Sequence, residues 1–145
     1  MVQIDIEYQG GLRCQAIHGP SRNRLCTDAP VDNMGKGESF SPTDLVATAL
    51  GTCIMTILGI LADRHQRDLC GSRVTVCKEM TEVGPRRIAR LPVTLALAGA
   101  HPEEFQKRVE RSILSCPVAL SLHPEVRVPV EVRWEGQPPH HIALS

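Results

Sequence analysis

Two cysteines stand where thiol chemistry is feasible. Cys53 lies inside a long apolar segment, and Cys116 directly precedes Pro117. A cysteine thiolate can attack a peroxide oxygen, and the resulting sulfenic acid condenses with a second thiol into a disulfide. The two residues therefore predict an attacking thiol and a resolving thiol. That chemistry requires their Cα atoms to come within about 4.4–6.8 Å of each other in the fold.

A thiolate in an apolar segment needs a compensating positive charge. A free cysteine has a pKa of about 8.5, and burial suppresses its ionisation further. We therefore expect an arginine beside Cys53, because a guanidinium stays charged and can contact the sulfur and a peroxide oxygen together. The break at Pro117 would let Cys116 shift locally, and a short helix after it would offer N–H groups to a thiolate.

The other candidate nucleophiles and metal ligands are predicted to be structural. A cysteine in apolar surroundings more often packs as a small hydrophobic residue. We assign that role to Cys14, Cys26, Cys70 and Cys77. Surface or capping roles are expected for His65, His101 and His123, and His140-His141 is a weak metal site. No Cys-x-x-Cys occurs and no spacing fits structural zinc, so a structural zinc site is not expected.

Length and composition narrow the classes of protein to consider. A chain of 145 residues is predicted to be one domain spanning 1–145. Its 16 basic and 16 acidic residues balance, and only 3% of residues are aromatic, so nucleic acid and anionic membranes are not expected partners. The start of the chain lacks signal-peptide features, and the six cysteines are therefore expected as free thiols in a reducing cytoplasm.

The segment 41–68 is predicted to be a central helix. Ser41 is the expected N-cap, Pro42 the first helical residue, and Asp44 stands close to the capping-box position. No charge occurs from Leu45 to Ala62, which raises the alternative of a membrane span. The threonines and glycines of this segment and its acidic flanks argue against that alternative. A helix that is apolar all round is otherwise buried on every side, so we expect a partner subunit to help cover it.

The rest of the pattern predicts an α+β fold with antiparallel sheets. Segment 1–40 is expected to be a strand meander followed by a loop, with alternating residues such as Ile4 and Ile6 on one half-buried face. Segment 72–134 is expected to contain a hairpin, an amphipathic helix, a short helix after Cys116 and a final strand. Segment 135–145 is expected to be a loose tail. Separate blocks of strands and helices favour α+β over a parallel doubly wound sheet.

Two motifs resemble those of a known family. Residues 41–53 read Ser-Pro-x-x-Leu-x-x-x-x-Leu-Gly-x-Cys, and residues 115–118 read Ser-Cys-Pro-Val. With this element order, they resemble the OsmC/Ohr family of osmotically induced and organic-hydroperoxide-resistance proteins. The resemblance covers nearly the whole chain, and its specificity lies in the two motifs together, whose cysteines are sixty-three residues apart.

The resemblance implies an intertwined homodimer with antiparallel sheets around long buried central helices. It also implies a peroxidase in which Cys53 attacks an organic hydroperoxide or hydrogen peroxide and Cys116 resolves, regenerated by a dithiol reductant without metal or organic cofactor. The family's active-site arginine comes from the N-terminal sheet near a Gly-Gly turn. Arg13, directly after Gly10-Gly11-Leu12, is the nearest match, and Arg22 and Arg24 remain alternatives.

One position departs from the family pattern. The better-characterised peroxidases carry a glutamate ten residues before the attacking cysteine, where this chain has Thr43 followed by Asp44. Successive helical residues point about 100° apart, so Asp44 is not equivalent to that glutamate. Two functions therefore stay open: a thiol peroxidase, or a non-catalytic binding protein that holds an apolar ligand in a pocket at the dimer interface.

Overall fold

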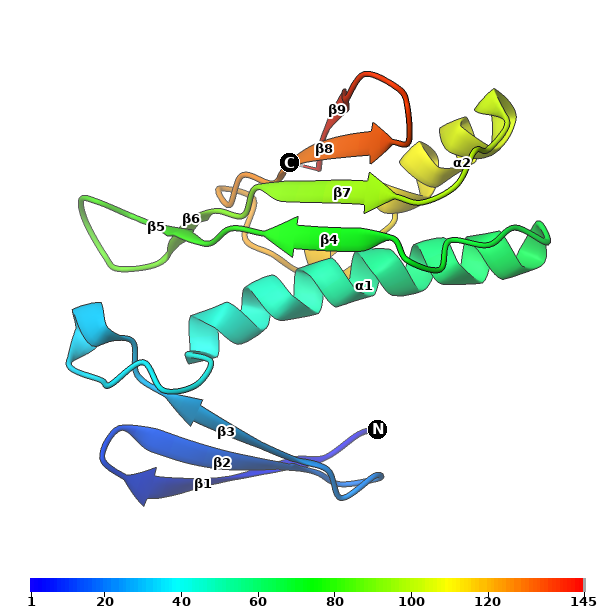
Figure 1. Ribbon diagram of the computed structural model, residues 1–145. Coiled ribbons are helices and arrows are strands. Elements are labelled where there is room, and N and C mark those ends of the chain that lie inside the picture. The colour runs from blue at the N-terminus through cyan, green and yellow to red at the C-terminus, as the bar shows by residue number, and fades with distance from the viewer. Residues whose placement is uncertain (145) are drawn as a thin grey trace. The chain divides into compact units, whose positions relative to one another are not determined.

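The computed structural model describes residues 1–144 and divides the chain into two compact units. The N-terminal unit is Met1–Val46, and the C-terminal unit is Ala47–Ser145. The predicted α+β class is confirmed, with mostly antiparallel sheets and one long helix (Figure 1). Each unit has its own sheet, so the two are described in turn.

The N-terminal unit is built on the expected three-stranded meander. Strands β1 (Ile4–Gly10), β2 (Arg13–His18) and β3 (Arg24–Asp28) pair antiparallel in the order β1-β2-β3. At the β1–β2 turn, Gly10 and Gly11 have φ angles of 82° and 57°, in the left-handed region that glycine adopts without strain. The Gly-Gly pair therefore sets where β2 begins, and with it the position of Arg13.

The apolar face of this meander is not half-buried as the alternation predicted. Ile4, Ile6 and Tyr8 share one face of β1 and are 58%, 69% and 65% exposed. The alternation was read correctly, because the three side chains do lie on one side of the sheet. They form an exposed apolar row on β1.

A closed loop joins β3 to the long helix. It contains a short 3-10 turn, η1 (Val31–Asn33). The N–H groups of Gly35 and Gly37 donate to the carbonyls of Pro30 and Ala29 at 3.0 and 3.1 Å, which folds the loop back on itself. A Cβ atom at Gly35 would lie 1.8 Å from the Ala29 carbonyl oxygen, so only glycine fits there. The loop is therefore a defined structure that fixes the residues following it.

Helix α1 (Pro42–Arg64) begins where the sequence indicated. Ser41 Oγ accepts the Asp44 N–H at 3.2 Å, and the Asp44 carboxylate accepts the Ser41 N–H at 2.7 Å. These reciprocal bonds are a capping box with aspartate in place of glutamate. The helix ends at Arg64 rather than at residue 68, because Gln66 has a left-handed φ of 52° and the Arg67 N–H bonds back to the Ala62 carbonyl.

Helix α1 has the length and composition of a membrane span, but one of its sides is core. Leu50, Ile54 and Leu58 are fully buried in this chain. Gly51 lies directly against β4, because a Cβ atom added there would be 3.0 Å from a Val76 methyl carbon. The helix is thus the core helix of an α+β fold, as the sequence favoured.

The C-terminal unit contains a four-stranded sheet with the order β4-β7-β8-β9. Its strands are β4 (Arg73–Val76), β7 (Val93–Leu97), β8 (Pro129–Trp134) and β9 (His140–Ala143). The pair β7–β8 is parallel, and the other pairs are antiparallel. The predicted hairpin is present but interrupted: its outer part is a separate pair of short strands, β5 (Glu79–Met80) and β6 (Ile88–Arg90).

The prediction of a loose tail was wrong. Residues His140–Ala143 form β9, which pairs antiparallel with β8. Val130 lies opposite Ile142 in this ladder, and Val132 lies opposite His140. The tail has only one large apolar residue in its strand, so its side-chain pattern was too weak to predict a strand that backbone hydrogen bonds create.

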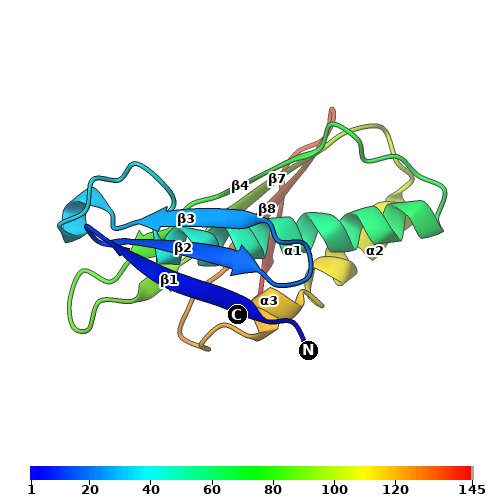
Figure 2. The same ribbon diagram turned by 90° about the horizontal axis from the view of Figure 1, so that it is seen from below.

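Two further helices complete the C-terminal unit, as expected. Helix α2 (Glu103–Ile113) is amphipathic and buries Phe105, Val109 and Ile113. Helix α3 (Pro117–Leu120) begins at the Cys-Pro sequence. In Figure 2, α1, α2 and α3 lie on one side of the β4-β7-β8 sheet. The inward residues of the two central strands are accordingly buried: Val93, Leu95, Leu97, Val130, Val132 and Trp134.

Candidate active site

Helix α1 positions Cys53. The side chain is half-buried and lies two residues after Gly51, at the level where the helix contacts β4. The next residue, Ile54, is fully buried. Cys53 therefore sits at the border of the core, where its thiol has neighbours from the C-terminal unit and remains partly accessible.

Cys116 is held at the junction of α2 and α3. It is fully buried, and its extended backbone, with φ −62° and ψ 115°, occupies the N-cap position of α3. Pro117 follows as the first helical residue, where its missing N–H costs no hydrogen bond. The Cys116 carbonyl accepts the Leu120 N–H at 3.0 Å, which ties the cysteine into the turn.

The two thiols interact directly. Burial raises the pKa of the Cys116 thiol, and a hydrogen bond with the Cys53 thiol and the charge of its thiolate raise it further. Hydrogen bonds from the Ala119 and Val118 backbone N–H groups lower the same pKa. The structure thus brings together the two cysteines that the sequence singled out, and it leaves Cys116 protonated more readily than an ordinary cysteine.

Arg13 lies in the N-terminal unit, within a small cluster of charges. It is the first residue of β2, and its guanidinium pairs with the carboxylates of Glu38 and Asp28, the latter at 3.5 Å. These two carboxylates raise the pKa of Arg13, with Glu38 making the larger contribution. Arg22 lies in the β2–β3 turn and Arg24 in β3. The pairing of any of these arginines with Cys53 remains a prediction.

Asp44 caps helix α1. Its carboxylate accepts the Ser41 N–H in the capping box of α1. Thr43, which occupies the glutamate position, has its hydroxyl 3.1 Å from the Ser41 hydroxyl. Both side chains therefore contribute to the first turn of the helix.

A family model for OsmC-like proteins matches residues 35–131, a stretch that contains both cysteines. The chain belongs to the OsmC-like family. A crystal structure of a candidate osmotic stress induced and detoxification response protein from Psychrobacter arcticus 273-4 is 42% identical, with a TM-score of 0.86. The match covers 92% of this OsmC-like chain and 96% of that one. A search of curated proteins gave no match.

More distant members share the fold. An organic hydroperoxide resistance protein OsmC from Legionella pneumophila is 16% identical with a TM-score of 0.70, over 91% of this chain and 96% of that one. An organic hydroperoxide resistance protein from Elizabethkingia anophelis is also 16% identical, with a TM-score of 0.72 and 91% and 94% coverage. At this identity the likeness shows that the OsmC-like fold is common to all three.

The sequence reading of this OsmC-like chain missed two residues of the charged cluster, Asp28 and Glu38. Glu38 belongs to the segment read only as loop, and Asp28 to the end of a strand. Asp28 could have been identified from the pairing of β2 with β3, which places it opposite Arg13. The contact with Glu38 depends on the folded path of the loop, which residue types alone do not specify.

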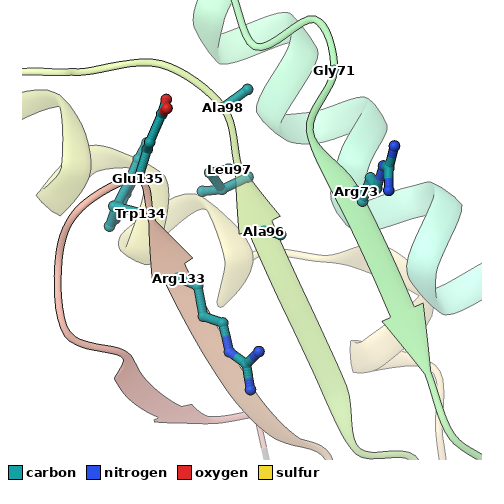
Figure 3. Close-up of a pocket in the computed structure, with 8 residues that line it drawn as sticks. All are labelled: Gly71, Arg73, Ala96, Leu97, Ala98, Arg133, Trp134 and Glu135. Atoms are coloured by element: carbon teal, nitrogen blue, oxygen red, sulfur yellow. The ribbon is translucent and has the colours of Figure 1, made fainter.

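The C-terminal sheet has a hollow that could bind a small molecule (Figure 3). It has a volume of about 430 Å³ and is lined by Gly71, Arg73, Ala96, Leu97, Ala98, Arg133, Trp134 and Glu135. Arg73, Ala96 and Arg133 lie side by side on adjacent strands, but the two guanidinium groups point in different directions, and Arg133 pairs with Glu131. The hollow contains neither Cys53 nor Cys116, so it is not the thiol site.

The other four cysteines are separate in sequence from the Cys53–Cys116 pair. Cys26, Cys70 and Cys77 are exposed free thiols, and Cys14 is a half-buried one. Among residues 1–144, no group of three or more histidine, cysteine, aspartate or glutamate side chains is placed to hold a metal ion.

Proposed function

We propose that this OsmC-like protein is a thiol peroxidase that reduces organic hydroperoxides or hydrogen peroxide. One observation carries the proposal: the Cys53 thiol, remote in sequence, lies close enough to Cys116 to help raise the pKa of the Cys116 thiol. A disulfide needs both sulfurs in reach of one another, and a resolving thiol must already be near when the first is oxidised. The names of two fold relatives, which are organic hydroperoxide resistance proteins, support the same substrate class.

The proposed reaction has three steps. The Cys53 thiolate attacks one peroxide oxygen, so that an S–O bond forms while the O–O bond breaks, and the departing alkoxide takes a proton to leave as the alcohol. Cys53 becomes a sulfenic acid and the peroxide is reduced by two electrons. The Cys116 sulfur then attacks Cys53, and the hydroxide that leaves combines with the Cys116 proton as water. An external dithiol reduces the disulfide and returns both thiols.

The burial of the two thiols and the raised pKa of Cys116 suit this order. Cys53, at the border of the core, is assigned the attacking role, and the proposed activating cation is Arg13, with Arg22 and Arg24 as alternatives. Cys116, fully buried and with a raised pKa, stays protonated and does not compete for the peroxide. Because the thiolate is the nucleophile, the raised pKa of the buried Cys116 thiol favours the resolving role for it.

A homodimer in the cytoplasm is part of the proposal. On α1, Thr52, Thr56 and Ile60 are exposed at a spacing of four residues, and the hydroxyls of the two threonines donate to the helix carbonyls of Thr48 and Thr52 at 2.8 Å. This stripe and the exposed apolar face of β1 are surfaces that a second copy would cover. A reducing compartment is needed to recycle the disulfide, and the six cysteines are free thiols.

The proposal is tested by peroxide consumption with purified protein. Tert-butyl hydroperoxide and hydrogen peroxide are supplied in turn with dithiothreitol as the dithiol, and peroxide loss is followed over time. Cys53→Ser is expected to abolish consumption, whereas Cys116→Ser should accumulate Cys53 as an over-oxidised acid or as a mixed disulfide with dithiothreitol. Cys26→Ser, which removes an exposed thiol outside the pair, is the matched control and should turn over normally. Unchanged turnover in Cys53→Ser would contradict the assignment.

The same samples distinguish the peroxidase from a binding protein. That alternative stays open because Thr43 stands where the better-characterised peroxidases carry a glutamate. A protein that only holds an apolar ligand has no reason to oxidise one pair of thiols selectively. Counting free thiols by mass spectrometry after peroxide addition therefore distinguishes the two functions. Selective loss of Cys53 and Cys116 supports the peroxidase, and slow loss spread over all six cysteines supports the binder.

A further inference from the structure

Asp28 is a buried carboxylate in the N-terminal unit. It is the last residue of β3, its side chain is 1% exposed, and its register partner across the β2–β3 ladder is Arg13. Aspartate is almost never fully buried unless it is paired. Its burial therefore indicates a specific requirement for a negative charge at this point of the sheet.

The surroundings of Asp28 make it depend on a cation. Its Oδ2 atom accepts the Glu38 backbone N–H at 2.9 Å and lies 3.5 Å from Arg13 Nη2. Its Oδ1 atom is buried, with no hydrogen-bond donor in good geometry among residues 1–144. A buried charge with an incomplete set of hydrogen bonds is costly unless a counter-charge is near. The Glu38 N–H and the Arg13 guanidinium lower the pKa of Asp28, which keeps it ionised at neutral pH.

The same carboxylate fastens the loop that carries Glu38. The Asp28 N–H donates to the Phe40 carbonyl at 3.1 Å, and the Asp28 side chain receives the Glu38 N–H. The Glu38 side chain, which is 59% exposed, pairs with the same Arg13 Nη2 atom as Asp28 does. An exposed ion pair is weakened by salt, whereas a buried one is screened much less. Of the two carboxylates on Arg13, Asp28 is thus the fixed one.

We propose that Asp28 is a positioning residue for Arg13: its buried charge holds the guanidinium at one place, both directly and through the loop that presents Glu38. The inference rests on the proposed function, in which Arg13 is the cation that favours the Cys53 thiolate. Here two carboxylates outside the helix motif, one buried and one exposed, act on the arginine, while Thr43 and Asp44 complete the helix cap.

Other charged groups share this face of the sheet and must be separated from Asp28. By register, Asp5 and Glu7 of β1 and Arg24 of β3 lie on the same side as Arg13. The Glu7 carboxylate accepts the Gln9 side-chain amide at 3.0 Å. Glu7→Gln therefore removes the same charge from the same face without touching the cluster, and it is the matched control for Asp28→Asn.

The experiment measures the pH profile of Cys53 alkylation in the full-length protein. Iodoacetamide labelling of the Cys53 peptide is followed by mass spectrometry from acid to alkaline pH, with peroxide consumption measured in parallel. Asn at position 28 can still accept the Glu38 N–H, so the loop is kept while the charge is lost. We expect Asp28→Asn to move the midpoint to higher pH by about one unit, which is about a tenfold loss of thiolate at neutral pH. Glu7→Gln should leave the profile in place.

Two further variants make the proposal sharper. Glu38→Gln should shift the profile in the same direction, and that shift should vanish in about 1 M salt, where the screening length is about 3 Å. Arg13→Lys keeps the charge but replaces the rigid guanidinium, whose Nη2 atom contacts both carboxylates, by an ammonium on a flexible stem, so it should shift the profile in the same direction as Asp28→Asn. The Arg13→Lys variant tests the proposal even if Asp28→Asn does not fold. An unchanged alkylation profile in Arg13→Lys would overturn the proposal.

The outcomes separate this inference from the proposed function. If Arg13→Ala shifts the profile and Asp28→Asn does not, the positioning role is wrong and the peroxidase stands. If Arg13→Ala leaves the profile unchanged, Arg13 is not the activating cation and the positioning role is overturned with it. If Cys53→Ser still consumes peroxide, the proposed function itself fails.

Discussion

The two sheets of this protein follow the same alternation of side chains but differ in what covers them. In the C-terminal sheet, Leu95 and Val132 face the helices and are fully buried. In the N-terminal sheet, Ile4, Ile6 and Tyr8 form an equally regular apolar row that is more than half exposed. Alternation specifies which residues share a face, and the presence of a covering element is a separate matter. The exposed row is where a second copy of the chain is proposed to bind.

The largest effect is expected in the C-terminal sheet. Leu95→Ala removes a fully buried side chain from its central strand β7 and leaves a cavity beneath the helices. Its free energy of unfolding should fall by about 2–5 kcal/mol, as for other large-to-small core substitutions. Urea denaturation measures the loss. A loss below about 1 kcal/mol would mean that this sheet is not the rigid core described here.

The contact between α1 and the same sheet can be tested with two glycines of one helix. Gly51→Ala would place a Cβ atom 3.0 Å from Val76, and overpacking of this kind costs about 1–3 kcal/mol. Gly59 has no atom within 4 Å of the corresponding position, so Gly59→Ala should instead gain about 0.5–1 kcal/mol from helix propensity. Thermal unfolding of both variants gives the comparison. Equal effects would contradict the one-sided contact.

The exposed row of the N-terminal sheet should control self-association. Ile6→Lys introduces a charge into the surface proposed to bind a second copy, and the dimer dissociation constant should rise by at least about tenfold, or 1.4 kcal/mol. Glu7→Lys alters the neighbouring residue on the opposite face and should leave association unchanged. Sedimentation velocity over a dilution series distinguishes them. An identical state in both variants would locate the dimer surface elsewhere.

A smaller effect is expected on the acid stability of the N-terminal unit. The pKa of Asp28 is lowered in the folded state, so its ionised form contributes stability above the ordinary carboxyl pKa of about 3.9. That contribution is lost as the pH falls through the lower folded-state value. In Asp28→Asn the decline of the unfolding temperature below pH 5 or so should therefore be shallower than in the wild type. Parallel curves for the two proteins would remove Asp28 as a source of the acid dependence.

Much of the fold was predictable because local signals were strong. Ser41 and Asp44 marked the start of α1, and the Cys116-Pro117 sequence marked the start of α3. The strand β9 was not predictable, because its main stabilisation is the ladder with β8 rather than an apolar pattern of its own. The parallel pairing of β7 with β8 likewise follows from the path of the helical connection between them.

The candidate site was predictable only in part, for a related reason. Cys53 and Cys116 could be singled out by residue type and motif, and the fold then brings Cys53 close enough to influence the pKa of the Cys116 thiol. Asp28 carries no local motif, and its importance comes from burial and from lying opposite Arg13. Glu38 reaches the arginine only because Gly35 and Gly37 let the loop close. Functions that depend on a loop's path are hidden from residue types.

The central claim is that Cys53 and Cys116 act as one redox pair. The most direct measurement adds one equivalent of tert-butyl hydroperoxide to the reduced protein, followed by digestion without reductant and mass spectrometry. The account predicts one dominant cross-link joining the Cys53 and Cys116 peptides, formed at the rate at which peroxide disappears. Cross-links scattered among the other cysteines, or both residues recovered as free thiols after the peroxide is consumed, would contradict it.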